Sequence, residues 1–241
     1  MLHSTQGIVF HSIKYSETSV IVKIYTELFG IQSYLFRGVR SPRSRIKSGL
    51  FQPLTLLDMV VYHKEKQTLH SVKEIRLAYP YHSIPFDIRK SSVTLFLNEL
   101  LYHSIREEEP NPELFAFIRN SCMELDSTTE SVAAFHLFFA LQLCHHLGIF
   151  PQLNYCADTP VFNLREGQFQ AYIPDHTHYL DATDSKQLYH LLCLSGQGLS
   201  VVSMKPETRN HILDIILLYY KLHLPGFKGV ESHHILHGVF S

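Results

Sequence analysis

The chain has 241 residues, 45% of them hydrophobic and 18% charged, which is the composition of a globular protein with one large core or two modest ones. The formal net charge of −1 gives the whole molecule no polyanion-binding signature. The charge is unevenly distributed, however. Residues 1–80 carry 11 Lys and Arg against 5 Asp and Glu, a net charge of +6, whereas the remainder carries 10 against 17, a net charge of −7. This asymmetry indicates two regions with different partners.

The first region has the pattern of β-strands from Gly7 to about Leu77. Apolar residues alternate with polar ones in short runs, and turn-forming residues separate the runs. After a first strand beginning near Gly7, the runs predict strands over residues 20–25, 31–36, 54–62 and 69–77. Five short strands in this span predict a small barrel or sandwich.

The most basic segment, RGVRSPRSRIKSG at residues 37–49, connects the third and fourth predicted strands. We call residues 37–47 the basic segment; its cations are Arg37, Arg40, Arg43, Arg45 and Lys47, with no acid among them. Like charges this close repel one another unless a polyanion screens them, and guanidinium groups suit phosphate oxygens. The segment therefore predicts either contacts to a DNA backbone or an ordinary solvated loop. Lys14 and Lys23 are weaker candidates for the same contacts.

Strands that flank a basic loop are typical of an OB-fold, in which sheet aromatics stack on bases while cations follow the backbone. Tyr34 and Phe36 share one face of the third predicted strand, and we place them beside Lys23 and Tyr25 of the second. We expect Tyr34 and Phe36 either to stack on bases or, as strand aromatics commonly do, to face the core.

After Pro80 the pattern becomes helical. Asp87 is expected to cap a first helix, and Asn111 followed by Pro112 to open a second. Residues 127–130 have capping-box spacing and predict the start of a third, nearly all-apolar helix that stops at Gly148.

The rest of this region returns briefly to strands. Residues 161–173 predict a hairpin with its turn at 165–168, followed by helices near 185–194 and from Pro206. We therefore expect an α+β fold: an N-terminal OB-fold β-barrel at residues 1–80 and a mostly α-helical domain with a small β-hairpin at 81–241.

The cysteines and apolar runs indicate a cytoplasmic protein that enters no membrane. Cys122, Cys144, Cys156 and Cys193 are far apart and form no CxxC pair, which fits a reducing compartment. The opening MLHSTQG lacks the pattern of a secretion signal. The most apolar stretch, residues 135–150, is short for a bilayer span and predicts a buried helix.

Catalytic and metal-binding patterns are weak. The chain has 17 histidines, of which His176 and His178, with Asp175 and the distant Cys156, could gather a zinc ion, but that spacing matches no common site. No GxSxG, HExxH or glycine-rich phosphate loop is present. We expect no catalytic residue, no metal and no cofactor, and rank a histidine-metal hydrolase last.

Several segments together resemble the RecO family of recombination mediators. GIVFHSIKYSETSVIVKIYTELFG, RGVRSPRSRIKSG and LFQPLTLLDMVVYHK are similar to that family's N-terminal domain. LGIFPQLNYC and YYKLHLPGFKGVESHHIL are similar to its helical domain and C-terminal end. The segments follow the family's order across nearly the whole chain.

The resemblance implies an N-terminal OB-fold followed by a mostly helical domain, in a non-enzymatic DNA-repair protein of the RecF pathway. It implies binding to single- and double-stranded DNA, annealing of complementary strands, and binding to the tail of the single-stranded DNA-binding protein. It also implies action with RecR to help load RecA.

The chain departs from the family at a zinc motif. Many members carry four cysteines after the segment that matches LGIFPQLNYC. Here Cys156 matches the first of them, Thr159 stands where the second would be, and residues 168–178 contain no cysteine. We therefore expect no zinc and a hairpin held by packing alone.

An alternative of a different class stays open. The chain would then be a protein–protein interaction module whose OB-like domain binds protein and whose basic segment meets an acidic partner. Competition between DNA and the acidic partner distinguishes a DNA-binding factor from a protein–protein interaction module.

Overall fold

The computed structural model describes residues 1–39, 48–64, 67–106, 108–195 and 204–241. By internal contacts the chain forms two compact units, Met1–Thr128 (unit 1) and Thr129–Ser241 (unit 2).

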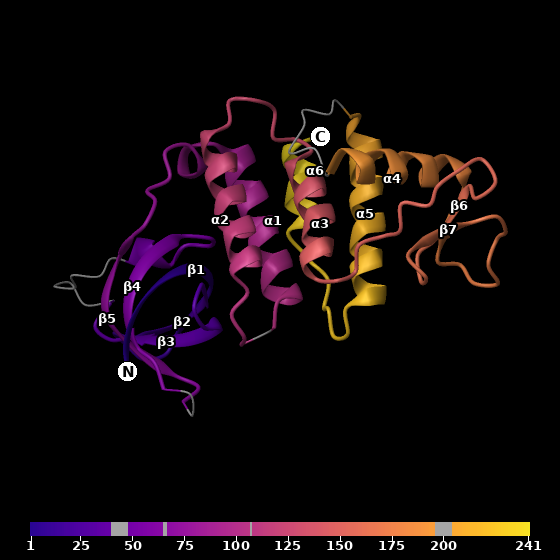
Figure 1. Cartoon of the computed structure of the whole chain (residues 1–241). Helices are drawn as coiled ribbons and strands as arrows, with labels where there is room; N and C mark the ends of the chain where they lie inside the picture. Colours follow the sequence, from indigo (N-terminus) through magenta and orange to yellow (C-terminus); the bar gives the residue numbers. More distant parts are fainter. Residues whose placement is uncertain (40–47, 65–66, 107, 196–203) are drawn as a thin grey trace. The chain divides into compact units, whose positions relative to one another are not determined.

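Unit 1 begins with a closed five-stranded barrel (Figure 1). Its strands are β1 (Leu2–Lys14), β2 (Val20–Thr26), β3 (Gly30–Phe36), β4 (Leu56–Tyr62) and β5 (His70–Leu77), in the order β1-β2-β3-β5-β4. All neighbours are antiparallel except β3 and β5, which pair in parallel at Tyr34 and His70. The predicted five-stranded barrel is confirmed, although β1 starts at Leu2, five residues before the predicted start.

Closure of the barrel depends on the length of β1, which pairs with β4 along its first half and with β2 along its second. Gly7 lies where the two pairings overlap, opposite both Thr26 and Leu57. A Cβ atom at this position would lie 2.5 Å from Cγ2 of Ile24, so a larger residue could not fit without moving the barrel core. The glycine is thus required by close packing inside the barrel.

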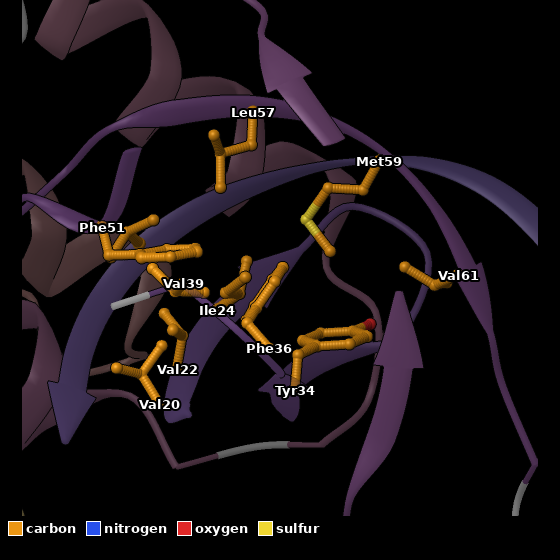
Figure 2. Close-up of a cluster of buried hydrophobic side chains, with 11 residues drawn as sticks. Val20, Val22, Ile24, Tyr34, Phe36, Val39, Phe51, Leu57, Met59 and Val61 are labelled. Atoms are coloured by element: carbon orange, nitrogen blue, oxygen red, sulfur yellow. The ribbon is translucent and has the colours of Figure 1, made fainter. Parts of the chain in front are cut away.

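The barrel core contains side chains from β1 to β4 and from the connection between β3 and β4 (Figure 2). They are Val9, Val20, Val22, Ile24, Tyr34, Phe36, Val39, Phe51, Leu57, Met59 and Val61. Burial of one such large apolar side chain contributes about 1.5–3 kcal/mol. This cluster, rather than any single hydrogen bond, holds the barrel closed.

Two helices complete unit 1: α1 (Ile88–Ser104) and α2 (Pro112–Ser127). Both predicted N-caps are confirmed, because Asp87 accepts from the N–H of Arg89 at 2.8 Å and Asn111 from that of Leu114 at 3.0 Å. The helices pack on the barrel. Asn98 of α1 donates to the carbonyl of Phe10 at 2.9 Å, and the ring of Phe115 on α2 lies 6.0 Å from that of Tyr25. By internal contacts the barrel and these two helices thus form one compact unit, which ends at Thr128.

The connection from barrel to helices is held by one buried carboxylate, that of Asp126 near the end of α2. It accepts the backbone N–H groups of His82, Ser83 and Ile84 at 2.9–3.1 Å. The ammonium group of Lys90, itself buried, donates to the carbonyl oxygens of Asp126 and Thr128. We call these residues the Asp126 clasp.

Unit 2 consists of four helices and a small sheet among the described residues. Its elements are α3 (Phe135–His146), β6 (Val161–Asn163), β7 (Gln168–Gln170), β8 (Tyr179–Leu180), α4 (Ala182–Ser195), α5 (Pro206–His223) and α6 (His233–Val239). The predicted hairpin is confirmed as β6 and β7, and β8 pairs with β6 to extend it to a three-stranded sheet. Nine of the twelve residues of α3 are buried, as its apolar pattern predicts.

One predicted boundary is wrong. The capping box at 127–130 does not start the third helix, because Ser127 is the last residue of α2 and Thr128 is its C-cap. The Asp126 clasp needs Asp126 inside α2, so α2 extends through the predicted start, and α3 begins only at Phe135. None of the described helices is both long and apolar enough to cross a membrane.

Candidate nucleic-acid interface

Four of the predicted DNA-contacting residues, Arg40, Arg43, Arg45 and Lys47, lie outside the described residues. Arg37, the first cation of the basic segment, directly follows β3 and is exposed. The segment is therefore the connection from β3 to β4, as predicted. The described residues directly before and after the basic segment show which part of the barrel carries it.

Strand pairing brings Lys14 to the same end of the barrel as Arg37. Lys14 pairs with Val20, and Val20 pairs with Phe36, the residue before Arg37. Both cations are exposed. Two residues far apart in sequence thus lie together where the basic segment begins.

Lys23 lies further along β2, on the outer face of the barrel. It pairs with His11 on β1 and with Ser33 on β3. Its ammonium nitrogen is 5.6 Å from the ring centroid of Tyr102 on α1, and the His11 ring is 5.1 Å from the same ring. A cation above an aromatic face at this distance is attracted by the ring quadrupole. The sequence does not identify Tyr102 or His11 as site residues, because Tyr102 only follows the apolar stripe of α1 and carries no motif.

The proposed base-stacking role of Tyr34 and Phe36 is wrong. Their side chains are 0% and 2% exposed and lie in the barrel core (Figure 2). Tyr34 pairs with Val22, and it is Ser33 that pairs with Lys23. The predicted placement was one residue out of register, and because side chains alternate along a strand, that shift moves them to the opposite face. Burial raises the pKa of the Tyr34 hydroxyl above its usual range, which agrees with a core position.

The face made by β1, β4 and β5 has a different character. A hollow of about 880 Å³ lies over it. A hydrogen-bonded row crosses it, in which Arg119 donates to Gln6 at 3.2 Å, Gln6 donates to Asp58 at 3.0 Å, and Arg76 donates to Asp58 at 3.2 Å. The hollow is lined by two cations, Lys73 and Arg76, and by three acids, Glu27, Asp58 and Glu74. Because both cations pair with acids there, this face does not favour a polyanion.

The cations on the other side of the barrel are not neutralised in this way. Among the described residues, none of Lys14, Lys23 and Arg37 forms an ion pair with an acid. Exposed cations without acidic partners remain available to phosphate oxygens. Lys14 and Arg37 lie at the end of the barrel and Lys23 lies on its outer face; we call the part of β1, β2 and β3 that carries these three exposed cations the cationic face.

The loop before the small sheet does not fit the family's zinc site. Thr159 stands in the second cysteine position, where its hydroxyl donates to the carbonyl of Asn154 at 3.0 Å and accepts the N–H of Cys156 at 3.1 Å. His176 accepts the N–H of His178 through Nδ1, so that nitrogen is not directed at an ion. In the described parts of the chain, no three His, Cys, Asp or Glu residues lie close enough together to hold a metal.

Hydrogen bonds instead hold this loop to the sheet, so the expectation of packing alone is wrong. The side-chain amide of Asn154 both donates to the carbonyl of Phe169 and accepts its N–H, each at 2.9 Å. Gln152 adds a backbone bond to the carbonyl of Gly167 at 2.8 Å. Asn154 thus pairs with β7 as a neighbouring strand would.

Unfolding of unit 2 is accordingly expected to depend on Asn154 and not on a metal ion. Asn154→Ala should lower the free energy of unfolding by about 1–3 kcal/mol, because a partly buried strand loses both partners. EDTA should leave the thermal midpoint of the unchanged protein where it is. Asn210→Ala, on α5, is the matched control and should have little effect. A stoichiometric zinc ion in the purified protein would contradict this account.

Comparison with known proteins agrees with the fold. Residues 1–81 match the family model for the recombination protein O N terminal region, and residues 85–230 match that for its C terminal region. The chain is 37% identical to the DNA repair protein RecO of Bacteroides fragilis and 34% identical to that of Phocaeicola vulgatus, over the full length of each chain. It is 36% identical to the DNA repair protein RecO of Flavobacterium psychrophilum over 98% of both chains. The chain therefore belongs to the RecO family of DNA repair proteins.

Proposed function

We propose that the chain is a non-enzymatic factor that binds DNA and anneals complementary strands in DNA repair and RecF-pathway recombination. The observation that carries this proposal is the cationic face. Lys14, Lys23 and Arg37 are exposed and, among described residues, unpaired with acids, on the side of the barrel where the basic segment begins. The remaining cations of that segment would extend the same surface.

Annealing requires that two negatively charged strands approach each other. Five cations within residues 37–47 are enough to neutralise phosphates of both strands at once. Phosphate contacts carry no sequence information, so the bases remain free to find their complementary register. Such a surface suits an annealing factor of low sequence specificity.

The titratable groups of the core support a role without catalysis. Burial raises the pKa of the Cys122 and Cys144 thiols to about 12, which makes them poor nucleophiles. Burial, with the positive charge of Arg209 nearby, lowers the pKa of His136 to about 3. Each of these side chains lies in a packed interior, out of contact with solvent.

We also propose protein partners for the more acidic, helical part of the chain. These are the C-terminal tail of the single-stranded DNA-binding protein and RecR, with which the chain would help load RecA at the nucleoid. Support comes from family membership and from the net charge of −7 after residue 80, which makes this part a poor DNA surface.

The salt dependence of DNA binding tests the proposal. The slope of log K against log salt for a single strand should become less steep by about 1.4 in Arg43→Ala/Arg45→Ala, since each phosphate contact contributes about 0.7. Affinity should fall similarly for all sequences. Fluorescence anisotropy of labelled oligonucleotides across a salt series measures both quantities. An unchanged slope would place the interface elsewhere, and no DNA binding by the unchanged protein at low salt would favour the protein-interaction module.

A further inference from the structure

With Tyr34 and Phe36 buried, any base stacking has to come from other aromatic side chains. Tyr15 and Tyr102 lie on the cationic face. Tyr15 follows Lys14 at the turn between β1 and β2 and is 61% exposed. Tyr102, near the end of α1, is partly exposed beside Lys23 and His11.

The two tyrosines flank a strip formed by His11 and Ile13 of β1. These two residues are spaced two apart along the strand, so their side chains point to the same side of it. Tyr15 follows directly after β1, four residues beyond His11 and at most roughly 13 Å from it at about 3.3 Å per residue. Ile13, 48% exposed, lies between them and pairs with Ile21 of β2.

The charges along the strip suit nucleic acid. Lys14 directly precedes Tyr15 in the sequence, and Lys23 lies above the ring of Tyr102. Glu17 is the only acid between residues 2 and 26. An aromatic ring with an adjacent cation is the arrangement that proteins use to stack a base and contact its phosphate at the same time.

We propose that this strip is a base-stacking site for single-stranded nucleic acid, in which Tyr15 and Tyr102 each stack on one base and Lys14 and Lys23 contact the phosphates. The inference rests on the proposed DNA binding and adds a basis for strand selectivity. In a duplex the faces of the bases are already stacked on one another. The tyrosines therefore contribute to binding of single strands only, whereas the basic segment contributes to both forms.

The variant Tyr15→Leu/Tyr102→Leu in the full chain tests this site. Leucine keeps an apolar side chain beside His11 but removes the aromatic face. Affinity for a labelled oligo-dT strand should fall roughly 5- to 100-fold for each tyrosine, while affinity for a duplex of equal length changes less than about twofold. The salt slope should stay unchanged, because stacking releases no counterions.

Two controls accompany this variant. Tyr15→Phe/Tyr102→Phe keeps both rings and should bind a single strand nearly as tightly as the unchanged protein. Tyr172→Leu removes a tyrosine of similar exposure, 69%, from unit 2 and should change neither affinity. Circular dichroism melting establishes that the leucine variant is folded.

The possible outcomes are distinct. A selective loss of single-strand affinity at constant slope supports the stacking site. Equal loss for single strand and duplex, or no loss in a variant of a protein that does bind DNA, overturns it. If the unchanged chain binds neither form at low salt, the proposed function fails as well, independently of the tyrosines.

Discussion

Replacement of all five cations of the basic segment by alanine is expected to weaken single-strand binding on the order of a thousandfold near 0.1 M salt. Each phosphate contact contributes a salt slope of about 0.7 on a single strand, so five contacts contribute about 3.5. Extrapolated from 1 M to 0.1 M salt, that slope corresponds to about 3.5 powers of ten in affinity. Annealing of complementary oligonucleotides should be lost in the same variant, as measured by the fluorescence of a paired dye and quencher.

The control for this variant removes cations from the opposite side of the barrel. Lys73→Ala/Arg76→Ala removes two positive charges that are already paired with Glu74 and Asp58. It should change DNA affinity much less than any two-residue change in the basic segment. If it weakened binding as strongly, net charge rather than the cationic face would explain the affinity. A basic-segment variant that binds single strands normally yet fails to anneal would separate the two activities and contradict the annealing mechanism.

Asp126→Ala is expected to lower the free energy of unfolding of unit 1 by about 3–5 kcal/mol. The change leaves three backbone N–H groups without the carboxylate that accepts them, whereas the ammonium group of Lys90 keeps its contact with the backbone carbonyl of Asp126. A hydrogen bond to a charged acceptor contributes about 1.5–3 kcal/mol, so the loss of these bonds accounts for a change of this order. Urea unfolding followed by circular dichroism measures the change. Asp87→Ala, which removes the half-buried N-cap of α1, should cost only about 1 kcal/mol.

The Asp126 clasp also has a pH signature. Burial by itself would raise the pKa of Asp126, but the N–H groups of His82, Ile84 and Ser83 outweigh it and hold the pKa below its usual range. The native pKa therefore lies below the unfolded value of about 3.9. The stability that the carboxylate contributes is present above pH 4 and is lost as the pH falls through the native pKa. The difference between the unchanged protein and Asp126→Ala should shrink below pH 4, and a constant difference would contradict this assignment.

The elements of the fold that have strong local signals could be predicted from the sequence. Alternation identified the barrel strands, and the caps Asp87 and Asn111 identified the starts of α1 and α2. The start of α3 could not be predicted, because Asp126 holds α2 helical through a contact with residues 82–84, more than 40 positions away. A local capping pattern at 127–130 carries no information about such a contact. Strand β8 has two residues and α6 has seven, too few for a periodic signal.

The charged residues of the candidate site could be predicted from the sequence, but the arrangement of its side chains in space could not. Lys14, Lys23 and the basic segment could be chosen by charge alone, whereas assigning Tyr34 to a face required the register of β2 and β3. Tyr102 could not be found, since α1 meets the β1–β2 pair only in the folded unit. Register and helix packing are long-range properties, and those two determine which aromatic rings are exposed.

The most direct test of the central claim is the salt dependence of single-strand binding by the unchanged chain. Anisotropy titrations of a labelled oligonucleotide between low and moderate salt give the slope of log K against log salt. A slope of roughly −3.5 or steeper is expected, because at least the five cations of the basic segment displace counterions. A slope near zero, or no binding at low salt, would contradict an electrostatic DNA interface on this face of the barrel.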